Sequence, residues 1–214
     1  MPVAERKYDR LLGIDTVGLR EWRARDTEYN RYEATPYRAL DRLFQSYRFH
    51  PRDRVVDFGC GRGRVAFAIH NRFHVPITGI EAHDKTFAEA LRNKPRYRER
   101  AHHISAPIRF EFGLAERYEV RPEENRFYFF NPFSKHIFKQ VVSNILHSVE
   151  RNLRPVDIIL YYPVPEYKRY LKKRTSFKIV NKIKVPGATD KHDKFLVYRL
   201  KPKEHNPKAS TPIS

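Results

Sequence analysis

Short apolar runs alternate with longer amphipathic stretches through the middle of the chain. The runs have the length and residue types of β-strands, and the stretches between them carry apolar residues at helical spacing. The predicted strands are 55–58, 77–81, 108–112, 126–130, 157–162, 177–185 and 194–200. The predicted helices are 64–72, 84–94, a long helix capped by Ser134, and 166–173.

Strands that alternate with helices predict a parallel α/β sheet. The last two predicted strands differ, because a loop of about eight residues joins them, and a parallel crossover needs about a dozen or more. They must therefore pair antiparallel. The predicted fold class is α/β: a seven-stranded, mainly parallel sheet with an antiparallel last strand, flanked by helices.

The chain before the first strand predicts a separate helical segment. Residues 1–15 are expected to form a loose leader, and residues 16–50 carry aromatic and apolar positions that favour helix. Thr35 followed by Pro36 is a typical helix start. The predicted organisation is an N-terminal helical cap over residues 1–50, a main domain over 51–200 and a flexible basic tail over 201–214.

Composition narrows the class of protein. A chain of 214 residues that is 40% hydrophobic can bury one sizeable core. Its single cysteine, Cys60, excludes a disulfide framework, and no metal-ligand spacing of histidines occurs. No apolar run reaches the roughly 20 residues that span a bilayer, and the charged start does not resemble a signal peptide. We expect a cytoplasmic protein without a metal or a membrane partner.

Three of the chain's eight glycines fall within five positions, at Gly59, Gly61 and Gly63, between the first strand and the first helix. Glycine permits positive φ and a close approach of a ligand to the backbone, and ligands of such folds bind at the carboxyl ends of the strands. The spacing is not the dinucleotide fingerprint, and the phosphate-binding P-loop is absent. Asp57 would repel a pyrophosphate but suits an ammonium group.

A second carboxylate, Glu81, ends the next predicted strand. An acidic residue in this place can accept hydrogen bonds from both hydroxyls of a ribose. Together with Asp57, it predicts a site for an adenosine that carries an amino acid.

The segment D-F-G-C-G-R-G followed by G-I-E resembles the first two motifs of class I S-adenosylmethionine-dependent methyltransferases, which have a Rossmann-like fold. The resemblance covers about residues 50–200 and implies S-adenosyl-L-methionine as the cofactor. It places Glu81 at the ribose, Ala82 and His83 beside the adenine, and Leu114 where the family usually has an acidic or polar residue. The cofactor-binding residues that we expect are Asp57, Gly59, Cys60, Gly61, Gly63, Glu81, Ala82, Leu114, Ala115 and Thr35.

The segment Asn131-Pro132-Phe133 follows the fourth predicted strand. It is similar to the [N/D]-P-P-[Y/F] element of amino-directed methyltransferases, with one proline fewer. That resemblance implies a catalytic role: the Asn131 side chain and a nearby carbonyl would accept hydrogen bonds from the target amine, and the aromatic ring would pack on it. The alternative is an ordinary strand end followed by a helix cap at Ser134.

The net charge of +18 exceeds what solubility requires. Residues 165–214 hold fourteen Lys and Arg against four Asp and Glu. One basic cluster, interleaved with Tyr167 and Tyr170, comprises Lys168, Arg169, Lys172, Lys173 and Arg174. A second cluster comprises Arg92, Lys94, Arg96, Arg98 and Arg100. Such clusters suit a nucleic acid or another acidic macromolecule, the alternative being solvated helix faces and a basic tail.

Three functions remain open at this point. The first is an S-adenosylmethionine-dependent methyltransferase that modifies a nitrogen of a nucleic acid or protein. The second is a non-catalytic nucleic-acid-binding or ribosome-binding protein with a vestigial cofactor pocket. The third is an NAD-dependent oxidoreductase, which the glycine spacing and Asp57 disfavour.

Overall fold

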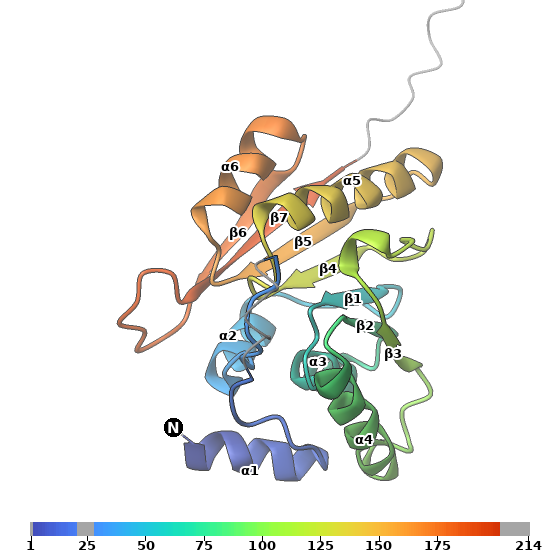
Figure 1. Cartoon of the computed structure of the whole chain (residues 1–214), viewed down its shortest axis with the longest axis vertical. Helices are drawn as coiled ribbons and strands as arrows, with labels where there is room; N and C mark the ends of the chain where they lie inside the picture. Colours follow the sequence, from blue (N-terminus) through green and yellow to red (C-terminus); the bar gives the residue numbers. More distant parts are fainter. Residues whose placement is uncertain (1, 21–27, 202–214) are drawn as a thin grey trace, which may run out of the picture.

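The computed structural model describes residues 2–20 and 28–201 (Figure 1). Most of the tail predicted over residues 201–214 lies outside the described part of the chain. The same holds for residues 21–27 of the predicted helical segment.

A single seven-stranded sheet forms the centre of the fold (Figure 1). Its order is β3-β2-β1-β4-β5-β7-β6, so β1 lies inside the sheet beside the central β4, and the chain winds outward from this pair in both directions. The strands are β1 Val55–Phe58, β2 Ile77–Glu81, β3 Ile108–Phe112, β4 Arg126–Phe129, β5 Val156–Tyr161, β6 Lys178–Lys184 and β7 Lys194–Leu200.

The strand directions confirm the predicted fold class. The first five strands run parallel, whereas β7 pairs antiparallel with both β5 and β6. The short loop between β6 and β7 forces this pairing, because it cannot carry the chain back to the other end of the sheet.

Helices cover both faces of the sheet. They are α1 Pro2–Leu12, α2 Tyr37–Ser46, α3 Arg64–Phe73, α4 Asp84–Arg100, α5 Lys135–Arg151 and α6 Pro165–Arg174, with a short 3₁₀ turn at Ala115–Arg117. The apolar side chains of α2, α3 and α4 join one buried cluster, and those of α5 and α6 join another. Neighbouring strand residues alternate between the two, as Val55 and Val56 do, because successive side chains point to opposite faces.

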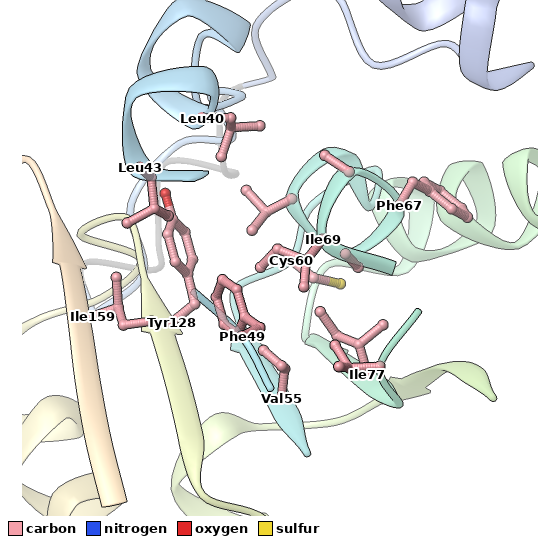
Figure 2. Close-up of a cluster of buried hydrophobic side chains, with 14 of the residues drawn as sticks. Leu40, Leu43, Phe49, Val55, Cys60, Phe67, Ile69, Ile77, Tyr128 and Ile159 are labelled. Carbon is pink, nitrogen blue, oxygen red and sulfur yellow. The ribbon is translucent and has the colours of Figure 1, made fainter. Parts of the chain in front are cut away.

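The cluster beneath α2 and α3 is continuous across the sheet. In Figure 2, Leu43 on α2 lies above Tyr128 and Ile159 of β4 and β5, and Ile69 on α3 lies above β1. Leu40 and Leu43 are fully buried. The helix α2 therefore packs in the same core as the sheet.

The N-terminal predictions need correction. Residues 2–12 form the helix α1 rather than a loose leader, and Asp9 near its end accepts hydrogen bonds from the backbone N–H and hydroxyl of Thr16. Of the predicted helical stretch 16–50, only residues 37–46 form a helix within the described part. The helical spacing lies in the set from Tyr37 to Tyr47, whereas Tyr29 and Tyr32 lie in isolated β-bridges.

Two helix boundaries also differ from the prediction. The residue at the N-cap of α2 is Pro36, and Thr35 instead exchanges a 2.9 Å hydrogen bond with the hydroxyl of Tyr128. The helix α4 continues to Arg100 through Pro95, where we expected it to end. The buried residue Tyr97 holds this extra turn, since its hydroxyl lies 2.6 Å from Nδ1 of His70.

Replacing Leu43 with alanine tests how far α2 supports the fold. Leu43 is fully buried, so Leu43→Ala is expected to lower the free energy of unfolding by about 2–5 kcal/mol. Leu153→Ala is the control, because Leu153 is 64% exposed, and it should change stability by less than about 0.5 kcal/mol. Urea unfolding measures both. Equal small losses would show that α2 is dispensable to the core.

Candidate functional site

The turn from β1 into α3 has the backbone that its glycines predict. Gly59, Gly61 and Gly63 have φ of 74°, 57° and 90°, values that residues with a side chain rarely adopt. The backbone N–H groups of Gly59 and Cys60 both donate to the carbonyl of Ile80 on β2, at 2.9 and 3.0 Å. The turn is thereby fixed at the carboxyl ends of β1 and β2.

Each of these glycines also allows a neighbour to come close. A Cβ at Gly59 would lie 2.4 Å from Cβ of Pro132, and one at Gly61 would lie 2.2 Å from the ring of Tyr32. At Gly63, the ring of Phe110 would lie 2.7 Å away. The glycines therefore bring three distant parts of the chain onto the turn.

Two buried carboxyl groups lie beside this turn. Glu81 Oε2 accepts a 2.8 Å hydrogen bond from the N–H of Gly61, and Oε1 accepts one of 2.8 Å from the N–H of His83. Burial raises the pKa of Glu81, and these backbone donors oppose the rise. Burial, with a smaller contribution from the charge of Glu81, raises the pKa of Asp57 to about 8.

Burial costs more free energy at Asp57 than at Glu81, because the Oδ2 atom of Asp57 is buried without a hydrogen-bond partner among the described residues. A buried carboxylate oxygen without a donor is strongly unfavourable unless a ligand supplies one. The atom therefore fits a cationic, hydrogen-bond-donating ligand group at this point.

A small cavity of about 50 Å³ opens beside the turn. Six of the residues predicted for the site line it: Gly59, Glu81, Ala82, Ala115, Pro132 and Phe133. His83, predicted beside the adenine, and Tyr29 and Tyr32 line it as well. The predicted residues that do not line it are Asp57, Cys60, Gly61, Gly63, Leu114, Thr35 and Asn131.

The structure places Cys60, Thr35 and Leu114 outside the cavity. Cys60 is buried against Gly79, where an added Cβ would lie 2.7 Å from the sulfur. Thr35 is buried against Tyr128. Leu114 lines a neighbouring hollow, whereas Gly113 and Ala115 on either side of it line the cavity.

The turn after β4 lies against the glycine turn, through Pro132 and Gly59. Asn131 has a φ of 41°, an unusual left-handed value that concentrates at functional positions. Its carboxamide makes no hydrogen bond with any residue that the structure describes. Phe133 is buried, and its carbonyl accepts a hydrogen bond from the hydroxyl of Tyr167 on α6.

An N-terminal strap, which we define as residues 14–20 and 28–33, crosses both turns. Its two parts pair with each other through Arg20 and Tyr32, whose backbones exchange hydrogen bonds of 3.2 and 2.8 Å. Within the strap, Asn30 donates from its backbone N–H to the carbonyl of Pro132 at 2.9 Å and from its side chain to the carbonyl of Asn131 at 2.8 Å.

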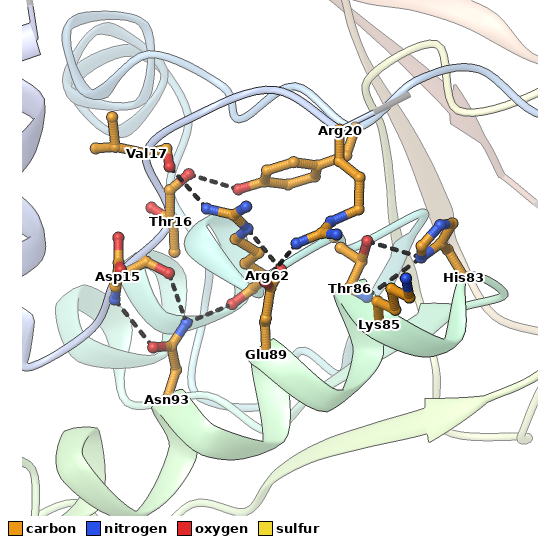
Figure 3. A network of polar contacts seen from close by, with 12 residues as sticks. Asp15, Thr16, Val17, Arg20, Arg62, His83, Lys85, Thr86, Glu89 and Asn93 are labelled. Carbon is orange, nitrogen blue, oxygen red and sulfur yellow. Dashed lines mark hydrogen bonds and ion pairs between the residues drawn. The ribbon is translucent and has the colours of Figure 1, made fainter. Parts of the chain in front are cut away.

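Charged contacts hold the strap on the glycine turn (Figure 3). Glu89 on α4 accepts hydrogen bonds from Arg20 of the strap at 2.5 Å and from Arg62 of the turn at 2.8 Å. Arg62 also donates to the carbonyl of Val17 at 2.7 Å. The ring of Tyr32 lies on Gly61, and strap residues form one wall of the cavity.

The sequence reasoning missed Arg20, Asn30 and Thr86, which also line the cavity. Arg20 and Asn30 belong to the strap, which was predicted as helix, so no pattern pointed to their side chains. Thr86 could have been predicted from the sequence, because it follows His83 by three residues at the start of a predicted helix. Its N–H donates to the side chain of that histidine.

No three metal-ligating side chains come together among the residues that the structure describes. Within the same residues, none of the helices has the length and apolar character needed to cross a bilayer.

Comparison with known proteins identifies the fold. No protein-family model and no curated sequence matches the chain. Solved structures do, among them an RNA methyltransferase from Salinibacter ruber with a TM-score of 0.53 and 15% identity, over 83% of this chain and 98% of that one. A tRNA (uracil-54, C5)-methyltransferase from Pyrococcus abyssi has a TM-score of 0.52 and 14% identity, over 76% of this chain and 38% of that one.

A third similar structure, geranyl diphosphate C-methyltransferase from Streptomyces coelicolor, has a TM-score of 0.50 and 13% identity, over 76% of this chain and 77% of that one. All three were solved with S-adenosyl-L-homocysteine. The chain has the fold of class I S-adenosylmethionine-dependent methyltransferases. The antiparallel β7 separates it from the parallel dinucleotide-binding fold and so disfavours the oxidoreductase hypothesis.

The raised pKa of Asp57 predicts a pH-dependent stability. Because the folded-state value of about 8 lies above the unfolded value of about 3.9, the stabilisation is complete below about pH 4 and is lost as the pH rises toward 8. The ligand-free protein should lose thermal stability between pH 5 and 8, and Asp57→Asn should flatten that decline. Thermal unfolding across this range measures it. Identical profiles for both proteins would contradict the assignment.

Proposed function

We propose that the protein is an S-adenosylmethionine-dependent methyltransferase that transfers a methyl group to a nitrogen atom. The observation that carries the proposal is the buried, unpartnered Oδ2 of Asp57 beside a glycine turn with positive φ. An oxygen in that position needs a donor, and the ammonium group of the cofactor supplies one.

Each residue of the site has a defined part in this proposal. Asp57 accepts a hydrogen bond from the cofactor's ammonium group, and Glu81 accepts from the ribose hydroxyls. Glu81 already lies with both oxygens at backbone donors, so its orientation is fixed before the ligand arrives. Ala82 and Ala115 are small residues of the cavity wall, suited to contact a flat base. When bound, the cofactor supplies the activated methyl group.

Transfer to nitrogen requires chiefly alignment, since the departing sulfide is neutral and the acceptor needs only its lone pair in line. Asn131 suits this task because its carboxamide is unpaired among the described residues and its strained backbone is held by neighbours on both sides. The carbonyls of Asn131 and Pro132 already accept hydrogen bonds from Asn30. The target amine would therefore use the Asn131 side chain first.

The size of the cavity sets a condition on this function. A volume of about 50 Å³ is far below the 300–1,000 Å³ of typical small-molecule sites. Cofactor binding therefore requires the strap to move away from Gly61. The same observation favours the second candidate function, a nucleic-acid-binding protein whose cofactor pocket is no longer used.

The acceptor is proposed to be a nucleic acid or an acidic protein, on the strength of the +18 charge. The fold does not choose between acceptors, because the similar structures include enzymes named for RNA, for tRNA and for geranyl diphosphate.

Calorimetric titration with S-adenosyl-L-methionine tests the cofactor site. We expect binding that tightens as the pH rises toward 8, since Asp57 must lose its proton to receive the ammonium group. Asp57→Asn should weaken binding at least tenfold and abolish this pH dependence. Asp41→Asn, an exposed carboxyl on α2, is the control and should bind as the parent protein does. Absence of binding by the parent protein at millimolar cofactor would favour the second candidate.

The role of Asn131 is tested by methyl transfer from labelled cofactor to fractionated cell extract. Asn131→Ala is expected to lower the transfer rate at least tenfold while cofactor affinity stays unchanged, because the residue would align the acceptor and not the cofactor. Asn152→Ala, an exposed residue at the end of α5, is the control. A parallel loss of cofactor affinity would indicate a structural role for the turn.

A further inference from the structure

The structure divides the basic cluster of α6 between two sides of that helix. Arg169, Lys173 and Arg174 line a hollow of about 400 Å³ between α6 and the start of α5, and Lys168 and Lys172 do not line it. Two lysines of α5 that the sequence reasoning did not single out, Lys135 and Lys139, form the other side of the hollow. We call this hollow the α5–α6 groove.

The cations of the groove make one contact within the described fold, that of Lys139, whose Nζ atom lies 5.9 Å from the centroid of the Tyr170 ring. All five are exposed, and none forms an ion pair or hydrogen bond with any residue that the structure describes. The groove lining, completed by Tyr170, contains no carboxylate. Five unpaired positive charges around one hollow repel one another, so an anion that enters the groove relieves that repulsion.

The second basic cluster behaves differently. On α4, Arg92 lies 3.8 Å from the carboxylate of Glu89, and Arg96 donates to the side chain of Asn93 at 2.8 Å. Arg98 donates to the carbonyl of Ile104, and Arg100 to the carbonyl of Arg10. Most of that cluster is therefore accounted for by internal contacts, which leaves the groove as the stronger candidate.

The helix α5 itself begins with positive charge, and the carboxylate nearest its start is that of Glu28, which accepts a hydrogen bond from the N-cap Ser134. The first turn of α5 contains Lys135 and His136 and no acidic residue. Cations at a helix N-terminus oppose the helix dipole and cost stability, whereas a bound anion there is favourable. The sequence thus places positive charge where the isolated helix would not favour it.

The groove lies next to the turn after β4, which contains Asn131. Lys135 follows Phe133 by two residues, so their Cα atoms are at most about 7 Å apart. The ring of Phe138 stacks on Tyr167 with centroids 3.7 Å apart, and Tyr167 donates to the carbonyl of Phe133. Phe138 also meets the edge of Tyr170, which lies in the groove, at 6.3 Å. Phosphate held in the groove therefore lies close to the turn.

We propose that the α5–α6 groove binds the phosphate backbone of a single-stranded nucleic acid and holds the acceptor base at Asn131. The placement of the acceptor base at Asn131 rests on the proposed function. Guanidinium and ammonium groups around a half-buried tyrosine ring match phosphates with a base between them, a combination that an acidic polypeptide lacks. Tyr167, which the sequence suggested as a second stacking ring, is buried and cannot serve.

The test measures binding of the full chain to a fluorescent twelve-nucleotide RNA, the DNA of the same sequence, and polyglutamate, by anisotropy at several salt concentrations. The groove variant is Lys139→Glu with Lys173→Glu. The control is Lys178→Glu with Lys182→Glu on the edge strand β6, which changes the net charge equally. Both variants are first checked for parent-like thermal unfolding.

We expect the groove variant to bind the nucleic acid at least tenfold more weakly near 0.1 M salt, and the control less than threefold. The slope of log affinity against log salt should fall by about 1.4 in the groove variant, for two lost phosphate contacts at about 0.7 each. Loss with RNA alone assigns the site to RNA, and loss with both assigns it to the shared phosphate backbone. Equal weakening by both variants, or polyglutamate binding as tight as that of the nucleic acids, overturns the proposal.

Cofactor titration of the groove variant separates this inference from the proposed function. The groove lies outside the cofactor cavity, so the variant should bind S-adenosyl-L-methionine as the parent protein does. If the parent protein does not bind cofactor but the groove variant still binds nucleic acid more weakly than the parent, phosphate binding in the groove is supported. The methyltransferase proposal, and with it the acceptor base at Asn131, is then wrong.

Discussion

The close approach of chain segments at the turn between β1 and α3 is the constraint on which the rest of the site depends. Three glycines with positive φ leave no side chain at the points where Pro132, Tyr32 and Phe110 meet the backbone. A methyl group at any of these places would overlap its neighbour. The turn therefore works as a junction for the strap, the β4 turn and β3, in addition to any contact with a ligand.

The same junction surrounds two carboxyl groups with protein. Glu81 has backbone donors on both oxygens, whereas Oδ2 of Asp57 has none among the described residues. Folding tolerates this because Asp57 holds a proton at neutral pH when no ligand is bound. In the ligand-free protein, Oδ2 of Asp57 lacks a hydrogen bond from any described residue. In the proposed function, this atom is where the protein recognises the amino-acid part of its ligand. A stability cost at a binding site is a common compromise in natural proteins.

The sheet was predictable from the sequence because its signals are local. Apolar runs marked the strands, and the short loop before β7 determined its direction. Gly59 and Glu81 were found from their places at the ends of predicted strands, and Pro132 from the resemblance to a family motif, and all three line the cavity. The strap was not predictable, since it is extended backbone held by partners far along the chain, such as Asn30 on Pro132. Nor was the groove, because helices α5 and α6 bring Lys139 and Lys173 together only through tertiary packing.

The strap contacts both halves of the site at once. Its Tyr32 ring covers Gly61, and its Asn30 donates hydrogen bonds to two carbonyls of the β4 turn. In the proposed function, a molecule that lifts the whole strap from one turn would also release it from the other, so that the free energy of opening would be needed only once. Two ligands that share one such cost bind with positive cooperativity, and each raises the affinity for the other by the same factor. In the proposed function, a strap that opens as one unit would link the occupancies of the two turns thermodynamically, although no side chain of one turn need touch the ligand of the other.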